Sequence, residues 1–209
     1  MTTSPDLNDL VADTISRMSQ LAAARDTAVN TSRQIVRSSA NAIRALHRGE
    51  DASELLAEAR ALLDQVVNET RPYPTVYWAG YTQDAMKEYA EAAITSALLN
   101  DGEIPSAEAI GVEDTAWLNG LAEAGSELRR DTLDALRADD TDRAERLLST
   151  MDQIYGVLVT IDFPDSITGG LRRTTDQFRG VLERTRGDVT MSVRQTRLER
   201  ALREAEGRL

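Results

Sequence analysis

Glycine and proline are few in this chain and fall in clusters, and this spacing limits the fold more than any other feature of the sequence. The 209 residues include 12 glycines and 5 prolines. Between the clusters, apolar residues recur every three or four positions, as in amphipathic helices, and no stretch alternates as a half-buried strand does. The sequence therefore predicts an all-α fold, an elongated bundle of about six to seven helices.

Six long helical patterns can be placed between the clusters. They run from about 6 to 48, from 51 or 53 to 70, 75–99, 115–137, about 141 to 163, and from 171 onward. The last pattern weakens at Gly187 and ends in a tail rich in arginine and glutamate. We therefore expect one helical domain over 1–190 and a charged helical tail over 191–209.

The absence of cysteine excludes disulfides and thiolate metal sites, and it fits a reducing interior. The N-terminal residues lack a basic segment followed by an apolar one, so they do not resemble a signal peptide. No apolar run approaches the roughly 20 residues of a membrane helix. We expect a cytoplasmic protein with no membrane partner.

Charge is strongly acidic, with 35 acidic and 24 basic residues and a net charge of −11. Only one of the basic residues, Lys87, is lysine. An acidic surface poor in lysine is typical of proteins from salt-rich cytoplasms, so we expect a halophilic source. At molar salt the Debye length is about 3 Å, and local clusters then matter more than net charge.

Carboxylates gather on one face of the pattern over 75–99. Asp84, Glu88 and Glu91 follow one another at i, i+4 and i+7, beside the apolar stripe of the same helix. Such like charges destabilise an isolated helix by about a few tenths of a kcal/mol per pair, and the spacing predicts no basic residue on that face. A bound cation would remove the repulsion.

The next long helix carries Glu123 and Glu127 one turn apart. If the two helices are antiparallel neighbours, four carboxylates converge without histidine or cysteine, which suits Mg²⁺ or Mn²⁺. The alternative is an ordinary solvated face. Glu123 and Glu127 lie nearly opposite the stripe of Leu118, Leu121, Gly125 and Leu128, so only a second buried face would place them inside.

A basic stripe is predicted on the first helix. Arg33, Arg37, Arg44 and Arg48 fall within about 60° of one another and span about 22 Å, with no acid among them. This stripe predicts a nucleic-acid surface, and an ion-paired subunit contact is the alternative.

The single histidine, His47, ends the same helix, and we expect no catalytic role for it. A ferritin-like di-iron site needs two histidines and is excluded.

Four segments together resemble the translin family, which includes translin and translin-associated factor X, and most closely its single-protein archaeal members. They are TSRQIVRSSANAIRALHRG, DAMKEYAEA, WLNGLAEAGSELRR and DFPDSITGGLRRTTD, and the resemblance covers about 26–188. It implies an all-α protein that assembles as a hollow octamer and binds single-stranded RNA or DNA. The factor X branch adds a metal-dependent endoribonuclease activity.

The catalytic branch carries Glu-Tyr-x-Glu on one helix and two acids four residues apart on the next. Glu88 with Glu91, and Glu123 with Glu127, match this pattern. Glu123 stands where the catalytic relatives carry Asp, which lengthens the side chain by one methylene. Translin carries a basic, histidine-containing patch before the helix that corresponds to 75–99. In this chain that patch is reduced to Arg71.

The leading hypothesis is therefore a homo-oligomeric endoribonuclease that uses Mg²⁺ or Mn²⁺. The four glutamates are the expected ligands and general-base candidates, and the arginine stripe is the expected RNA contact. One alternative is an oligomeric RNA- or single-stranded DNA-binding protein without catalysis. Another is a protein-interaction scaffold.

Overall fold

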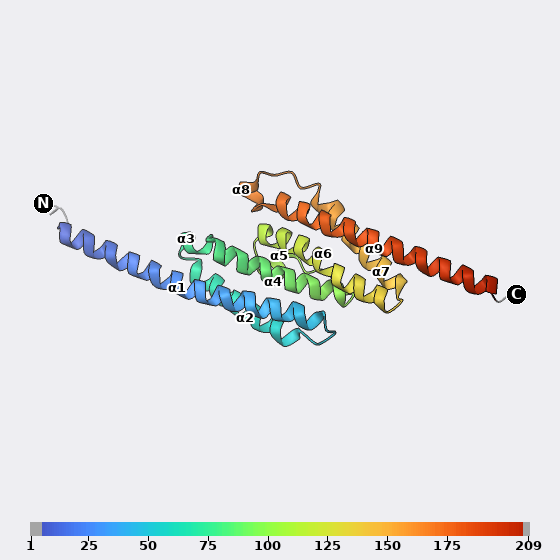
Figure 1. Cartoon of the computed structure of the whole chain (residues 1–209). Helices are drawn as coiled ribbons and strands as arrows, with labels where there is room; N and C mark the ends of the chain where they lie inside the picture. The colour runs from blue at the N-terminus through green and yellow to red at the C-terminus, as the bar shows by residue number, and fades with distance from the viewer. Residues whose placement is uncertain (1–5, 207–209) are drawn as a thin grey trace.

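The computed structural model describes residues 6–206, and within this range the fold is all α, without strands, as predicted. Figure 1 shows an elongated molecule with its long helices roughly aligned. The helices are α1 Leu7–Leu46, α2 Ser53–Thr70, α3 Pro74–Tyr77, α4 Gly80–Leu99, α5 Ala107–Ile110, α6 Asp114–Arg137, α7 Thr141–Leu158, α8 Asp165–Thr168 and α9 Leu171–Glu206.

The helix count in this range is nine, above the predicted six to seven, because α3, α5 and α8 are single turns of four residues. The pattern predicted over 75–99 is in fact two helices. Ala79 has an extended backbone with ψ of 147°, which ends the short α3 and lets α4 begin at Gly80. The last helix, α9, continues through Gly187 to Glu206, so the charged tail is helical as far as the structure describes it.

Local side chains explain where the long helices begin and end. The Asp6 carboxylate accepts a hydrogen bond from the backbone N–H of Asn8 and caps α1. Gly49, with φ of +69°, turns the chain after α1 as predicted, and Asp51 accepts from the N–H of Ser53 at the start of α2. These turns bring α2 back along α1.

Helix α6 is the centre of the bundle. It packs against α4 on one side and against α7 and α9 on the other, while α1 packs on α2 and α4. The core between these helices contains large side chains that are fully buried, among them Phe178, Met86, Ile94, Leu128 and Met151. Because α6 has neighbours on several sides, it has more than one buried face.

Two helical arms extend beyond the bundle at opposite ends of the molecule (Figure 1). The N-terminal arm, residues 7–27 of α1, exposes the apolar side chains of Leu7, Leu10, Val11, Ile15, Met18 and Leu21. The C-terminal arm, residues 190–206 of α9, follows Val189, the last buried residue of that helix, and exposes Met191, Leu198 and Leu202.

Within residues 6–206, no helix is both long and apolar enough to span a membrane.

Candidate metal centre

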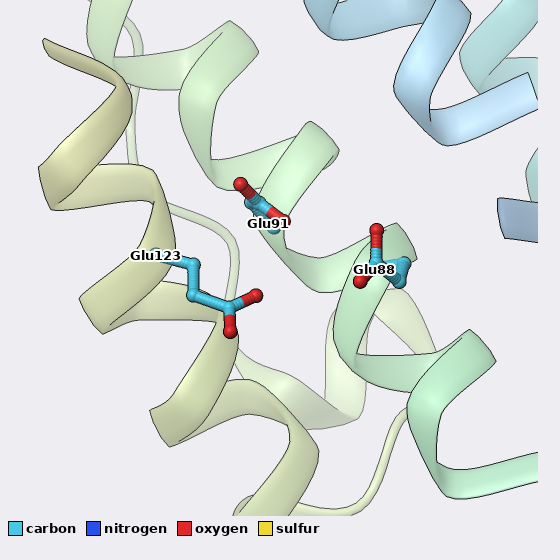
Figure 2. Close-up of side chains that lie close together, drawn as sticks. All are labelled: Glu88, Glu91 and Glu123. Atoms are coloured by element: carbon cyan, nitrogen blue, oxygen red, sulfur yellow. The ribbon is translucent and has the colours of Figure 1, made fainter. Parts of the chain in front are cut away.

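Three of the four predicted glutamates meet between α4 and α6. Glu88 and Glu91 come from α4 and Glu123 from α6, and each offers a carboxylate oxygen within 4.8 Å of the others. Figure 2 shows Glu123 extending from α6 toward α4, which carries Glu88 and Glu91. We refer to Glu88, Glu91 and Glu123 as the carboxylate triad.

A glycine lets the two helices approach closely enough for this meeting. A Cβ atom at Gly120 would lie 2.8 Å from the Cβ of Ala90, 2.9 Å from the nitrogen of Glu91 and 3.0 Å from the carbonyl oxygen of Lys87. Gly120 is one turn before Glu123, so the close backbone contact sets Glu123 beside Glu91. With Ala116 and Ala124, which are also buried, it forms a second buried face of α6.

This second face decides between the two interpretations of Glu123 and Glu127. Their side chains are 32% and 34% exposed, so neither lies on a fully solvated face. The helical pattern of α6 alone could not show this, because the face is made of alanine and glycine rather than of large apolar residues. Asp84, the other acid predicted beside Glu88, is exposed and lies outside the triad.

Glu91 is the buried member of the triad. It is 8% exposed, and within residues 6–206 no group donates a hydrogen bond to its carboxylate. Burial, together with the nearby charges of Glu123, Glu88 and Glu127, raises the pKa of Glu91 to about 9. In the absence of a cation, Glu91 is therefore protonated at neutral pH.

Lys87 corrects the expectation that no basic residue accompanies the acids of α4. Its ammonium lies 3.0 Å from the Glu88 carboxylate and also donates to Glu123 across the helix interface. Burial lowers the pKa of Lys87, but the hydrogen bonds to Glu123 and Glu88 outweigh it and raise the pKa above its ordinary value. Lys87 is therefore charged and shared by two members of the triad.

The structure separates Glu127 from the triad. Its carboxylate lies 2.6 Å from Nε2 of His47, whose Nδ1 lies 2.7 Å from Asp131. The hydrogen bonds to Asp131 and Glu127 raise the pKa of His47 to about 9, so both ring nitrogens are protonated and donate at neutral pH. We refer to His47, Glu127 and Asp131 as the histidine cluster; the side chain of His47 is 3% exposed.

Sequence reasoning missed Lys87, Asp131 and the contacts of His47. A partial signal was present, since Asp131 follows Glu127 by one helical turn and extends the same acidic line. The partners of that line come from α1 and α4, however, and pairing across helices cannot be obtained from the periodicity of one helix.

All four arginines of the stripe are exposed, but only Arg33, Arg37 and Arg44 lie in α1. Arg48 lies in the turn after α1 and forms a salt bridge with Glu50, just beyond the stripe, at 2.6 Å. Arg44 donates to the side chain of Asn41. Within the range 6–206, Arg33 and Arg37 make no salt bridge, and they are the available cations of the stripe.

The donor set of the triad suits a hard divalent cation. All three groups are carboxylates, and oxygen ligands without nitrogen or sulfur favour Mg²⁺, Ca²⁺ or Mn²⁺ over zinc or copper. The buried Glu91, which has no hydrogen-bond partner among the described residues, is the group whose charge most needs such a cation. The triad can therefore hold a metal ion.

The sequence and the fold of this chain are similar to those of several known proteins. No family model matches the chain. The uncharacterized protein MJ0175 of Methanocaldococcus jannaschii is 28% identical over 185 residues, which are 87% of this chain and 82% of the relative. The structure of apo-NeC3PO shares the fold, with a TM-score of 0.78 at 20% identity, over 92% of this chain and all of that one.

AfC3PO, whose structure is known alone and in complex with duplex RNA, shares both fold and sequence with this chain. The TM-score is 0.81 and the identity 34%, over 90% of this chain and 98% of AfC3PO. The chain therefore belongs to the translin/C3PO family.

Proposed function

We propose that this protein is an endoribonuclease that depends on Mg²⁺ or Mn²⁺, with the carboxylate triad as its metal site. The observation that carries the proposal is the convergence of three carboxylates around a close helix contact, with Glu91 buried and lacking a hydrogen-bond partner among residues 6–206. The solved complex of AfC3PO with duplex RNA supports RNA as the substrate.

The residues of the chain divide the work of such a reaction. Glu88, Glu91 and Glu123 would hold the ion, which supplies a water of lowered pKa and neutralises charge on the phosphodiester. Glu127 is paired with the charged His47, and as a carboxylate near the triad it adds to the attraction for a cation. It is the general-base candidate beside the triad.

A cleavage assay tests this proposal directly. Labelled single-stranded and duplex RNA is incubated in high-salt buffer with Mn²⁺, Mg²⁺ or EDTA and resolved on a denaturing gel. We expect cleavage that requires the metal and is lost in Glu88→Gln and Glu91→Gln. Asp84→Asn is the matched control, because Asp84 lies one turn before Glu88 on the same helix but outside the triad. Wild-type cleavage by both glutamine variants would contradict the proposal.

One observation favours a second candidate, a non-catalytic protein that binds RNA or single-stranded DNA. Lys87 already neutralises part of the charge of Glu88 and Glu123, as an internal structural ion pair would. Under this alternative, RNA stays intact with every metal and still migrates as a complex on a native gel in EDTA.

We propose the arginine stripe, Arg33, Arg37, Arg44 and Arg48, as the nucleic-acid contact. All four side chains reach solvent, and guanidinium groups bind phosphate in bidentate geometry. Arg33→Gln with Arg37→Gln should weaken RNA binding and reduce the slope of log affinity against log salt by about 2 for a duplex, since each contact contributes roughly 0.9. Arg179→Gln, on the exposed side of α9, is the control.

We further propose that the chain assembles with copies of itself, as an octamer, through its arms. The apolar side chains of the N-terminal arm continue the line of Ala28 and Ile35, which are buried in the bundle, and have no cover within residues 6–206. Ile15→Glu with Met18→Glu should reduce the mass measured by sedimentation, whereas Gln20→Glu should not. An unchanged mass would exclude the N-terminal arm as the interface.

We infer a cytoplasmic setting in a halophilic archaeon from the acidic, lysine-poor composition. The expected result is that folding and oligomerisation, followed by circular dichroism and sedimentation, improve as KCl is raised to molar concentration.

A further inference from the structure

The position of Lys87 is unusual for this chain. Apart from His47, all other basic residues of the chain are arginines, and this one lysine lies at the carboxylate triad. Its ammonium contacts Glu88 and Glu123, the two members that are 28% and 32% exposed. The buried Glu91 receives no hydrogen bond from it. Lys87 therefore binds the two more exposed members of the triad.

We propose that Lys87 is the counter-cation of the metal-free site. Its ammonium binds Glu88 and Glu123 until a divalent cation binds these carboxylates. The ammonium then moves to the rim, the solvent-exposed edge of the site, where it contacts the phosphate of a bound strand. This inference rests on the proposed function, because it assumes that the triad binds a metal ion. It assigns to Lys87 a role in setting metal affinity and in positioning substrate.

The ammonium of Lys87 and a divalent cation would share the same ligands. The ammonium already occupies oxygens of two of the three carboxylates, and the ligand oxygens of all three lie within 4.8 Å of one another. A divalent cation bound by the triad would face the ammonium at short range in a partly buried site, where repulsion is screened weakly. The two cations therefore compete for Glu88 and Glu123.

A lysine side chain is suited to exchange between two partners. An ammonium is a compact charge on a flexible four-carbon stem, so it can release one partner and reach another. A guanidinium is planar and binds a carboxylate with two parallel hydrogen bonds, which would hold it in place. The side chain of Lys87 is 21% exposed, which leaves it a path toward solvent. As a point charge at the rim, it can bind a phosphate oxygen.

Metal binding to the purified full-length protein tests the competition. Mn²⁺ affinity is measured by calorimetry for wild type, Lys87→Gln, Lys87→Arg and Arg200→Gln. The last variant removes one charge from an exposed position of the C-terminal arm and is the matched control. We expect Lys87→Gln to bind Mn²⁺ about tenfold more tightly than wild type, in the usual range of coupling between two ligands, and Lys87→Arg to bind no more tightly. Circular dichroism verifies that each variant is folded.

Two results distinguish failure of this inference from failure of the proposed function. If wild type binds Mn²⁺ and Lys87→Gln binds it equally or more weakly, Lys87 is not a competitor and the inference is wrong. If neither wild type nor Lys87→Gln binds Mn²⁺ or Mg²⁺ at millimolar concentration, the metal site itself is wrong and the proposed function falls with it.

Because the chain has one lysine, an amine-specific reagent reports on Lys87 alone, apart from the terminal amine. Acetylation of each site is followed by peptide mass spectrometry with and without Mg²⁺. We expect Mg²⁺ to accelerate acetylation of Lys87 several-fold and to leave the terminal amine unchanged, which makes that amine an internal control. Equal rates of Lys87 acetylation with and without Mg²⁺, under conditions where calorimetry shows binding, would overturn the displacement.

The phosphate contact is tested by measuring the binding of a short labelled RNA, whose integrity is verified on a denaturing gel after each measurement. In wild type, Mg²⁺ should raise the affinity for this RNA, and in Lys87→Gln the increase should be smaller by about threefold to tenfold. An identical increase in both proteins would limit Lys87 to competition with the metal.

Discussion

Two groups of charged residues lie along the same side of α6, one turn apart, and they differ in how their charges are balanced. In the histidine cluster, one buried cation hydrogen-bonds to both Glu127 and Asp131. In the carboxylate triad, one cation serves Glu88 and Glu123, while Glu91 is buried without any. Residues of the same type therefore differ because of the cation that each neighbouring helix supplies.

This difference suggests a structural role for the histidine cluster and a functional role for the carboxylate triad. A fully hydrogen-bonded charge cluster orients its members, and it links the end of α1 to α6 through His47. A buried carboxyl with a strongly raised pKa and no partner destabilises the folded state, and such groups concentrate at functional sites. The following experiments test that division.

Removing the cation of the histidine cluster should have the largest effect. His47→Ala leaves Glu127 and Asp131 facing each other without a counter-charge. Loss of one partner of a fully buried pair costs about 3–5 kcal/mol. Because Glu127 is 34% and Asp131 15% exposed, we expect about 2 kcal/mol here. Urea denaturation measures the loss, and Arg48→Gln, at the adjacent exposed position, should not change stability.

The metal affinity of glutamine variants on α6 should follow the same division. Glu127→Gln removes a charge near the triad but no proposed ligand, so Mn²⁺ affinity should fall about tenfold, as for an outer-shell group. Glu123→Gln removes a proposed ligand and should lower the affinity well beyond that. Equal losses, measured by calorimetry, would place Glu127 among the ligands.

The close contact of α4 with α6 should be sensitive to a single methyl group. Gly120→Ala gains about 1 kcal/mol in helix propensity but forces the added carbon against backbone atoms of Lys87 and Glu91, which costs about 2 kcal/mol. We expect a net loss of about 1 kcal/mol and weaker Mn²⁺ binding. Gly187→Ala has open space around its Cβ, so it should stabilise α9. Stabilisation by both substitutions would show that the helices do not meet at Gly120.

The stability of the metal-free protein should also depend on pH, in a direction set by His47 and Glu91. His47 keeps its proton in the folded protein up to about pH 9, against 6.5 ordinarily, so its stabilisation is complete below pH 6.5 and lost between 6.5 and 9. Ionisation of Glu91, whose pKa is raised from 4.5 to about 9, destabilises the folded state in the same direction.

Unfolding of the metal-free protein in urea, repeated from pH 5 to 9, measures this slope. Glu91→Gln should flatten the curve below pH 6.5, where His47 does not titrate, and His47→Gln should flatten it mainly above. A wild-type stability that rises between pH 6.5 and 9 would contradict both assignments.

Much of the fold could be predicted from the sequence because long helices carry their own periodicity. The six predicted patterns correspond to the long helices, and Gly49 and Asp51 mark a turn through backbone geometry and capping. The single-turn helices and the break at Ala79 could not be predicted, since three or four residues carry too little periodicity. At Gly187 the pattern weakens but the helix continues, because a glycine with open space around it weakens a helix without ending it.

The site could be predicted only as far as single helices and the family resemblance allow. The spacing of Glu88 and Glu91 places both on one face of α4, and Glu123 with Glu127 on one face of α6. Which of these meet depends on Gly120, whose role appears only when the partner backbone is known. The same holds for Lys87 and His47: Glu123 is 36 residues from Lys87, and the partners of His47 are 80 and 84 residues away in sequence.

The exposed arms make the shape of one chain depend on its concentration. An isolated helix in water is marginally stable without tertiary contacts, and residues 7–27 have almost none within the described chain. If further copies cover the arms, assembly and arm folding are one equilibrium. Dilution should then lower the helical signal in circular dichroism and make the arms accessible to proteases. The bundle would stay folded, while the arms would be ordered only in the assembled protein.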